Sequence, residues 1–184
     1  MDIRLRPIKA SEFDAYQAYF VQDYAQEIMD NYGHSNLVAI EMAKTAIKTS
    51  FPEGITEHND ALFCIDLIND ELIESDSAIN ALSNEAREED KTLATDDKAQ
   101  LAGYLWRIIN DEDSSCFISD FYVLPSMRSK GLGRLALTAL EGELKAKGIS
   151  QIKLRVAYQN QRAVRLYQDV GFTITGINMS KLLN

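Results

Sequence analysis

The sequence predicts a mixed α/β fold, with one central sheet and helices on both faces. Three observations predict it: apolar runs with strand spacing, amphipathic helical stripes between them, and the composition of an ordinary globular protein. Of the 184 residues, 46% are hydrophobic, 26% are charged and three are proline. A single domain over residues 1–184 is expected, because this length can bury a substantial core by itself.

The first elements are a short strand from Ile3 to Pro7 and a helix from Ser11 to Asp30. Ser11 and Asp14 form an acidic variant of the capping box at the helix start. A second helix begins at Ser35 or Asn36 and is closed by residues 51–54. The first helix has one strongly aromatic face, which a buried stripe explains: Phe13, Tyr16, Phe20, Tyr24 and Ile28.

Two strands, Ala61–Ile68 and Leu101–Ile109, are predicted around an acidic insertion at about residues 69–98. The insertion carries ten acidic residues against three basic ones, which accounts for most of the formal net charge of -9. A solvated loop, either partly helical or mobile, explains this composition.

The stretch from Ser115 to Gly148 reads as strand, tight turn and helix. A hydrophobic run from Cys116 to Leu124 stops at Pro125, and a basic turn with two glycines follows. The apolar residues after the turn have the spacing of a helix with one buried face: Leu135, Ala136, Leu137, Leu140 and Leu144.

The turn predicts a binding site for a phosphate-bearing ligand. Gly131 and Gly133 let the backbone approach a ligand closely, and a helix N-terminus adds unpaired N–H groups and a positive dipole end. Arg128, Lys130 and Arg134 are expected to place three cations around the same spot. The P-loop and dinucleotide-binding patterns are absent; the pattern here is R-x-x-G-x-G.

A second strand and helix follow. Gln151 to Ala157 alternates as a strand, Asn160 is placed to cap a helix, and Gly171 ends that helix. The helical stripe consists of Ala163, Leu166, Tyr167 and Val170. Final strands are predicted at Phe172–Ile177 and Met179–Leu182.

Together these two segments resemble the GNAT family of N-acetyltransferases. R-x-x-G-x-G after a strand ending V-x-P, followed by N-x-x-A-x-x-L-Y-x-x-x-G-F, is similar to the paired acetyl-CoA signature of that family. The resemblance is firmest from Gly103 to Phe172. Tyr24–Glu27 and Asn178–Lys181 resemble a poorly characterised bacterial branch. The implied fold is the GNAT-like acyl-CoA N-acyltransferase fold, with a mostly antiparallel sheet in which the central strand and the Gln151–Ala157 strand splay apart.

The resemblance implies acetyl-CoA as a co-substrate, with no metal. The turn would hold its pyrophosphate, through Arg128, Ser129, Lys130, Gly131, Leu132, Gly133 and Arg134. The main chain of Tyr122 and Val123 would pair with the pantetheine arm. Asn160 would hold that arm or cap its own helix, with Ala163 and Tyr167 beside it.

The resemblance also implies direct attack by a free amine on the acetyl carbonyl. Tyr167 matches the family's tyrosine at the CoA sulfur and is assigned as general acid, with a core tyrosine as the alternative. Many members carry a glutamate at the position of Phe117, and the family's ribosomal-protein acetyltransferases often carry one at the position of Arg155; this chain has neither. Asp120 is the nearest candidate for the base, with Glu27 or a water chain as alternatives; Asp120 could equally bind backbone at a strand irregularity.

The acceptor is expected to be a small-molecule amine or a basic peptide. Its binding pocket is expected to be lined by Tyr24, Glu27 and Trp106. The acidic insertion could form a flap that recruits a cationic acceptor. A net charge of -9 argues against broad binding of nucleic acid or anionic membranes. A monomer or homodimer is expected.

Cys64 and Cys116 lie in apolar runs and are expected to be buried, and no metal-ligand spacing occurs. The sequence has no long apolar run and does not begin as a signal peptide, so the cytoplasm is the expected location. Two other functions stay open: a non-catalytic CoA-binding sensor or interaction module, and an α/β domain that binds another phosphorylated ligand.

Overall fold

A computed structural model describes residues 1–56, 59–68, 99–179 and 181. The strands in this part are β1 (Asp2–Pro7), β2 (Leu62–Ile68), β3 (Ala99–Asn110), β4 (Ser115–Val123) and β5 (Gln151–Leu154). They form one sheet in the order β1-β2-β3-β4-β5. All neighbours are antiparallel except β4 and β5, which are parallel. The predicted mixed, mostly antiparallel sheet is therefore confirmed.

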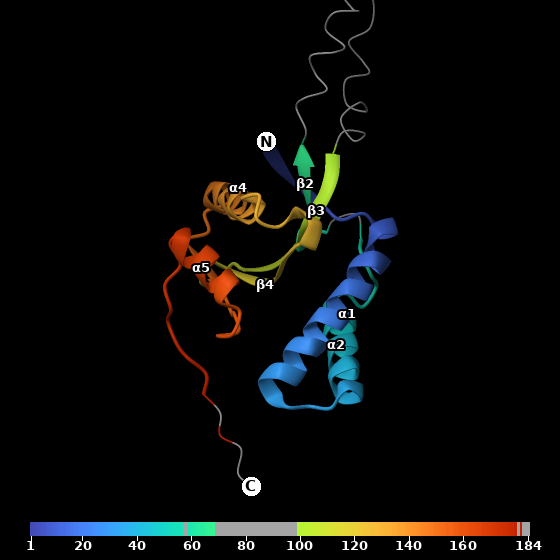
Figure 1. The fold of residues 1–184 in the computed structure, drawn as a ribbon. Coiled ribbons are helices and arrows are strands. Elements are labelled where there is room, and N and C mark those ends of the chain that lie inside the picture. Colours follow the sequence, from blue (N-terminus) through green and yellow to red (C-terminus); the bar gives the residue numbers. More distant parts are fainter. Residues whose placement is uncertain (57–58, 69–98, 180, 182–184) are drawn as a thin grey trace, which may run out of the picture.

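Helices cover both faces of the sheet, as predicted. Helices α1 (Ala10–Tyr32) and α2 (Asn36–Ser50) pack together on one side, and α4 (Leu132–Ala146) and α5 (Gln161–Asp169) lie on the other (Figure 1). A short 3₁₀ turn, η3 (Pro125–Met127), follows β4. In the described part of the chain, no helix has both the length and the apolar character needed to cross a membrane.

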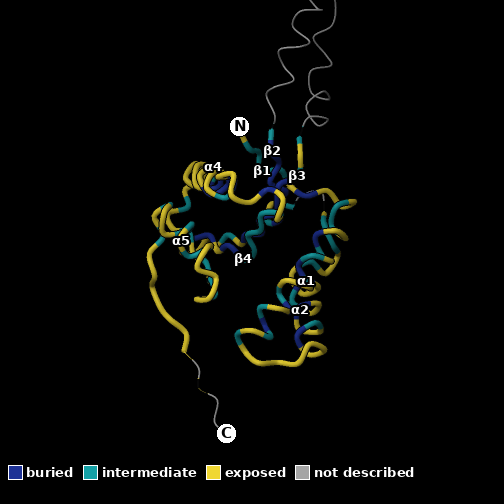
Figure 2. Tube along the Cα trace, viewed as in Figure 1, coloured by how far each residue is buried: buried dark blue, intermediate teal, exposed yellow. Residues whose placement is uncertain are grey.

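The side chains of β2 alternate between two cores. Phe63 and Ile65 pack with residues of α4, whereas Leu62 and Cys64 pack with the aromatic residues of α1. Burial on both faces explains why this strand is a nearly continuous apolar run. Figure 2 shows the buried positions concentrated in the sheet, on the helix sides that face it and where α1 and α2 pack together.

Helix α1 begins one residue earlier than predicted, and its capping box is different. The N–H of Lys9 donates to the Glu12 carboxylate at 2.8 Å, and the N–H of Glu12 donates to the Lys9 carbonyl at 2.9 Å. The predicted pairing of Ser11 with Asp14 is therefore wrong. Glu12 takes this place because it also accepts two hydrogen bonds of 2.9 Å from the Arg6 guanidinium.

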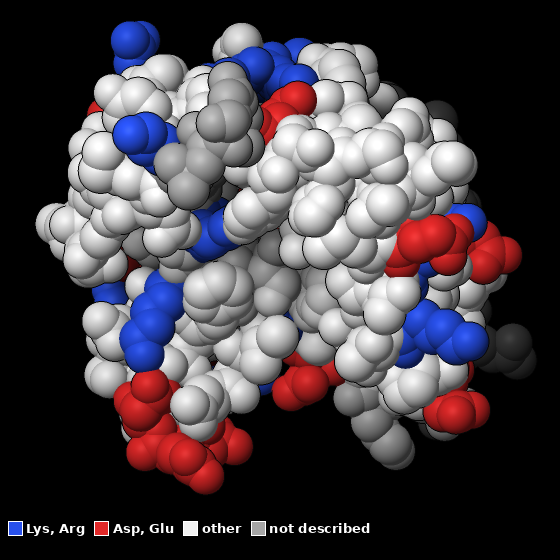
Figure 3. All heavy atoms as spheres, turned by 90° about the horizontal axis from the view of Figure 1, so that it is seen from below, with Lys and Arg blue, Asp and Glu red and all other residues white. Residues whose placement is uncertain are grey.

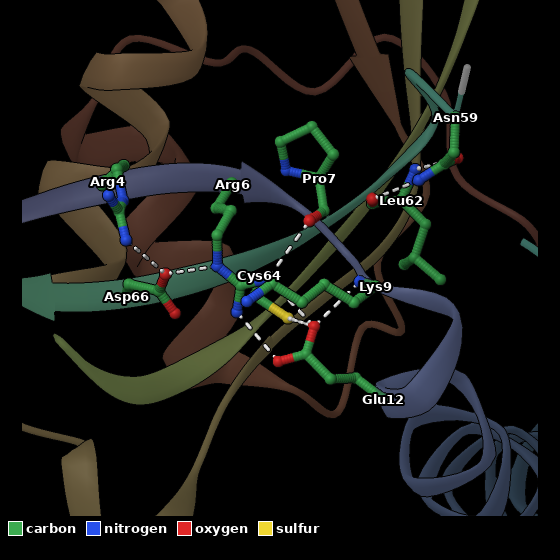
Figure 4. A network of polar contacts seen from close by, with 9 residues as sticks. All are labelled: Arg4, Arg6, Pro7, Lys9, Glu12, Asn59, Leu62, Cys64 and Asp66. Atoms are coloured by element: carbon green, nitrogen blue, oxygen red, sulfur yellow. Dashed lines mark hydrogen bonds and ion pairs between the residues drawn. The ribbon is translucent and has the colours of Figure 1, made fainter. Parts of the chain in front are cut away.

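An ion-pair network joins β1, β2 and the first turn of α1 (Figure 4). Arg6 Nε lies 2.8 Å from Asp66 Oδ2, and Arg4 Nη2 lies 3.4 Å from the same oxygen. The hydrogen bonds from Arg6 lower the pKa of Glu12. The buried thiol of Cys64 lies 3.9 Å from Glu12, and burial raises the pKa of this thiol to about 12. The network fixes the start of α1 against the sheet.

Two irregularities open the sheet beside β4. Trp106 pairs with Asp120 but Arg107 pairs with Ile118, so Ser119 is an extra residue and β4 has a bulge. The parallel pairing with β5 ends at Ile118, although β4 continues to Val123. The predicted splay between the two strands is therefore present, and the far half of β4 has an open edge.

The predicted final strand at Phe172–Ile177 is wrong, since residues 172–179 form no strand. Ile174 and Ile177 are 63% and 72% exposed. A strand needs a hydrogen-bonded neighbour, and this segment pairs with none of the described strands. Two of the four residues of the predicted Met179–Leu182 strand lie outside the described residues, as does the acidic insertion at 69–98.

Candidate active site

The turn between η3 and α4 presents a row of backbone N–H groups. Ser129 and Gly131 have positive φ values of 63° and 78°. The first backbone hydrogen bond of the helix is donated by Leu135 N–H to the Gly131 carbonyl, at 3.2 Å. Within the described part of the chain, the amides from Ser129 to Arg134 have no hydrogen-bond partner. They lie at the positive end of the α4 dipole, so this turn can bind an anion through its main chain.

The two glycines of the turn have different structural roles. Gly131 supplies the left-handed conformation, and a Cβ there would meet nothing within 4 Å. A Cβ at Gly133 would lie 3.0 Å from Leu166 Cδ2, on α5, and 3.7 Å from Phe121 Cε1. Gly131 therefore shapes the turn, and Gly133 allows α4 to pack closely on α5.

The three cations of the turn do not meet at one spot, which corrects the expectation from sequence. Arg128 Nε donates to the Val123 carbonyl at 2.8 Å. Arg134 forms an ion pair of 3.2 Å with Asp169, at the end of α5. Lys130 Nζ lies 3.7 Å from the Met127 sulfur. A fourth cation, Arg162 of α5, reaches the turn instead, since its Nη2 lies 3.4 Å from Ser129 Oγ. Sequence reasoning did not select it.

The main chain of β4 offers Val123, rather than Tyr122, at the open edge. The Tyr122 carbonyl points at β3, since a Cβ at Gly103 would lie 2.0 Å from it. The Val123 carbonyl points the other way and accepts the bond from Arg128. Arg128 also lies over the Tyr122 ring, with Cζ 5.3 Å from the ring centroid. Of Tyr122 and Val123, only Val123 therefore has a main chain that is available for the predicted pairing with the pantetheine arm.

Asp120 lies at the bulge, half-buried, and its carboxylate faces α1. Tyr16 Oη donates to Oδ2 at 3.1 Å, and Tyr19 Oη donates to Oδ1 at 3.2 Å. Burial raises the pKa of Asp120 to about 7, and the two hydrogen bonds oppose that rise. The charge of Asp23 raises the pKa further. Asp120 can therefore gain or lose a proton near neutral pH.

Tyr167 lies on the other face of β4. Its ring centroid is 6.4 Å from that of Phe121 and 5.5 Å from that of Phe172. Burial, and then the charge of Asp120, raise the pKa of the Tyr167 hydroxyl. This hydroxyl has no hydrogen-bond partner among the residues that the structure describes. The two predicted catalytic residues are therefore brought within electrostatic range of each other.

Asn160 caps α5. Its Oδ1 accepts from the N–H of Ala163 at 3.1 Å. Of the two roles left open for Asn160, the cap is present, and the Ala163 amide is occupied by it.

The three predicted acceptor residues have different surroundings. Glu27 Oε1 lies 2.7 Å from Arg155 Nη2, and this ion pair joins α1 to the chain that follows β5. Tyr24 is half-buried and stacks on Phe20 at 5.3 Å. Trp106 is only 6% exposed and packs in the aromatic core against Phe20 and Phe51. The structure therefore places Glu27 at the splay and Trp106 in the core.

Sequence reasoning missed Tyr19 and Asp23, which share a face of α1 with Tyr16 and Glu27. The spacing 16-19-23-27 places one side chain per turn toward the splay. The Tyr19 ring stacks on the Tyr122 ring with centroids 3.9 Å apart. The same spacing could have been read from the sequence, but it was not separated from the aromatic stripe of the core.

The surface on this side has few charges at its centre. Figure 3, which views the molecule from below, shows acidic and basic side chains mainly toward the edges and largely uncharged atoms between them. A separate hollow lined by Asp60, Arg107, Ile109 and Lys147 lies beside the end of β3 and includes none of the predicted site residues.

Comparison with known proteins agrees with this arrangement. Residues 51–172, which include the amide row, the bulge and Tyr167, match the model of the Acetyltransferase (GNAT) family.

The chain belongs to the GNAT family.

Similar GNAT proteins cover its whole length. The uncharacterized N-acetyltransferase YdgE of Bacillus subtilis is 25% identical, with 100% of this chain and 99% of the relative aligned. YycN of the same organism is 26% identical over all of both chains. The crystal structure of YycN superposes with a TM-score of 0.76, at 27% identity and 99% coverage of each chain.

A more distant fold match is the PaiA N-acetyltransferase of Thermoplasma acidophilum, solved in complex with coenzyme A. Its TM-score is 0.58 at 14% identity, with 97% of this chain and 94% of that chain covered. GNAT membership makes the protein an acyltransferase, and CoA as the acyl carrier is consistent with it.

Proposed function

We propose that the protein transfers the acetyl group of acetyl-CoA directly to a primary amine. The observation that carries the proposal is the row of unpaired amides from Ser129 to Arg134, next to the open edge of β4. A diphosphate fits such a row, because the amides and the helix dipole both favour anions. The edge at Val123 fits an amide chain, which can pair with it as an added strand.

The cofactor site proposed on this basis combines the amide row with the cations near it. Arg162 lies at the turn already. Arg128 would release the Val123 carbonyl when an amide donor of the pantetheine arm takes its place. When bound, acetyl-CoA supplies the activated acetyl group, and the protein supplies position and proton transfer.

Asp120 is the base in this proposal. An amine attacks only in its neutral form, so the ammonium must lose a proton, and a carboxylate with a pKa of about 7 can take it at neutral pH. The bulge at Ser119 turns this part of β4 out of regular pairing. That position brings the carboxylate to the region where β4 and β5 separate.

Tyr167 is the acid. When the amine nitrogen bonds to the acetyl carbon, the carbon–sulfur bond breaks and the sulfur takes the electron pair. The hydroxyl of Tyr167 stays protonated at neutral pH because its pKa is raised, so it can donate to that sulfur. The whole chain of 184 residues is proposed to act as one domain.

A turnover screen tests the proposal. Acetyl-CoA would be offered with polyamines, amino acids, aminoglycosides and basic peptides, and release of the CoA thiol would be recorded. In parallel, thermal shifts with CoA and with nucleotides would be compared. Stabilisation by CoA together with thiol release for an amine supports the proposal. If nucleotides but not CoA stabilise the protein, the cofactor site is misassigned.

A further inference from the structure

Helix α1 binds both oxygens of the Asp120 carboxylate. Tyr16 Oη lies 3.1 Å from Oδ2, and Tyr19 Oη lies 3.2 Å from Oδ1. The two tyrosines are three residues apart, so they project from the same face of the helix one turn from each other. Each oxygen therefore has its own donor, and both donors come from one rigid element.

Ring packing fixes both hydroxyl groups. Tyr16 is fully buried, and its ring meets that of Tyr104 edge to face at 5.1 Å. The Tyr19 ring stacks on that of Tyr122, at 3.9 Å, and on that of Tyr104, at 5.9 Å. Neither ring can leave without disturbing these stacks, so the hydrogen bonds to Asp120 are held in place.

Other groups around the carboxyl do not replace these donors. From α1, the charge of Asp23 opposes ionisation of Asp120, and on β4 the backbone N–H of Phe121 favours it. From α5, Tyr167 is a neutral hydroxyl whose own pKa the Asp120 charge raises, and β3 contributes the uncharged Trp106. In the described part of the chain, no cation forms an ion pair with Asp120. The tyrosine hydroxyls are thus the side-chain groups that favour its charged form.

We propose that Tyr16 and Tyr19 are positioning residues, which hold Asp120 ionised and oriented as the base that receives the proton of the acceptor amine. This inference rests on the proposed function, since it assigns a task to the base named there. The tyrosines act through Asp120 and transfer no proton themselves. Two neutral donors stabilise a carboxylate without neutralising it, whereas a cation in their place would make it too weak a base.

The two tyrosine hydroxyls should differ in how strongly they influence Asp120. Tyr16 is fully buried, so no water can replace its hydroxyl in a phenylalanine variant. Tyr19 is half-buried, and water can restore part of the lost hydrogen bond. Loss of the Tyr16 hydroxyl is therefore expected to change Asp120 more than loss of the Tyr19 hydroxyl.

The test compares rate–pH profiles for three phenylalanine variants. Tyr16→Phe and Tyr19→Phe each remove one hydroxyl that binds Asp120. Tyr104→Phe is the matched control, since its ring packs against both tyrosines and its hydroxyl does not bind Asp120. The acidic limb of kcat/KM is expected to move up by about one pH unit in Tyr16→Phe and by less in Tyr19→Phe. It should stay in place in Tyr104→Phe.

A second measurement does not depend on turnover. The carboxyl carbon of Asp120, identified by its loss in Asp120→Asn, can be titrated by ¹³C NMR in each folded variant. Raised midpoints in Tyr16→Phe or Tyr19→Phe, with an unchanged midpoint in Tyr104→Phe, support the inference. If both tyrosine variants titrate as the wild type does, the inference is wrong.

The same variants separate this inference from the proposed function. Should Asp120→Asn keep full activity, Asp120 is not the base, and both the assignment of the base and this inference fail. If Asp120→Asn is inactive while Tyr16→Phe and Tyr19→Phe keep the wild-type profile, only the inference fails. Because Tyr19 is half-buried, its variant keeps the test decisive even if Tyr16→Phe does not fold.

Discussion

At the scale of single residues, Asp120 is governed by opposing influences, of which burial is the strongest. Its burial and the charge of Asp23 favour the neutral acid, whereas two hydroxyl groups favour the carboxylate. These hydroxyls come from residues 104 and 101 positions earlier in the chain. The resulting pKa of about 7 suits a group that must accept a proton at neutral pH.

Tyr167→Phe tests the second proposed proton transfer, from the Tyr167 hydroxyl to the CoA sulfur. The variant keeps the ring that packs against Phe121 and Phe172 but loses the hydroxyl. We expect kcat to fall by roughly 100-fold, while the affinity for CoA changes little. Steady-state kinetics and a CoA titration measure the two effects. Tyr158→Phe, at a residue that is 76% exposed, is the control; an equal loss of kcat there would point to a general effect on the protein.

Gly131→Glu tests the amide row. The substitution places a carboxylate beside the proposed diphosphate site and forces a side chain into a backbone with φ of 78°. CoA affinity should fall by about 100-fold or more in a calorimetric titration. Gly131→Ala separates strain from charge and should retain more of the affinity. Gly142→Glu, at an open and exposed position of the same helix, should bind CoA normally.

At the scale of elements, β3 and β4 approach each other more closely than a side chain allows. A Cβ at Gly103 would lie 2.0 Å from the Tyr122 carbonyl oxygen and 3.1 Å from Val123 Cα. Only glycine can keep the strands in this register, and the register sets where the bulge, and thus Asp120, lies.

Gly103→Ala should therefore destabilise the fold by about 3 kcal/mol, because backbone atoms must move to admit the methyl group. Urea unfolding measures the change. Gly142→Ala is the matched control: its Cβ enters open space in a helix, so it should leave stability unchanged or raise it slightly. Equal stability of Gly103→Ala and the wild type would show that the strands can separate at low cost.

Which elements could be predicted depended on how local their signals were. The amphipathic stripes, the Gly131 turn and the Asn160 cap involve residues within a few positions of each other, and they were predicted correctly. The start of α1 was not, because Glu12 is selected by Arg6 of β1 as well as by Lys9. A final strand was predicted at Phe172–Ile177, but a local stretch of sequence does not supply a pairing partner, and residues 172–179 have none among the described strands.

At the scale of the whole molecule, the site is built from segments that are distant in the sequence. The order of motifs predicted that Gly131 and Tyr167 share one region, because both belong to the family signature. It did not predict that Arg128 would bind β4 or that Tyr19 would bind Asp120, since both depend on how α1 and the turn lie against the sheet. Nor did it predict the burial of Trp106, which follows from the pairing of β3 with its neighbours and from the packing of α1 and α2.

Global stability should respond to pH through these groups. Glu12 and Glu143 have lowered pKa values, chiefly from hydrogen bonds with Arg6 and Arg107, so their contribution is lost as pH falls below their ordinary value of 4.5. Asp120 acts in the opposite direction. Its pKa rises from 3.8 to about 7 on folding, so the folded state binds an extra proton in this window. The stability it contributes then declines as pH rises through the window and levels off above it.

Urea unfolding at a series of pH values checks this expectation. The free energy of unfolding of Asp120→Asn should decline less between pH 4 and pH 7 than that of the wild type, while both lose stability in stronger acid. Parallel curves for the two proteins would mean that Asp120 does not titrate in this range.

Through the ion pairs of Arg6, strand β1 influences the proposed active site although it does not contact Asp120. They anchor the beginning of α1, and the hydroxyls of Tyr16 and Tyr19 follow one and two turns later on the same rigid rod. Trimming or fusing the amino terminus so that β1 slips would carry those hydroxyls away from their carboxylate. An enzyme altered in this way would stay folded yet work best in more alkaline solution.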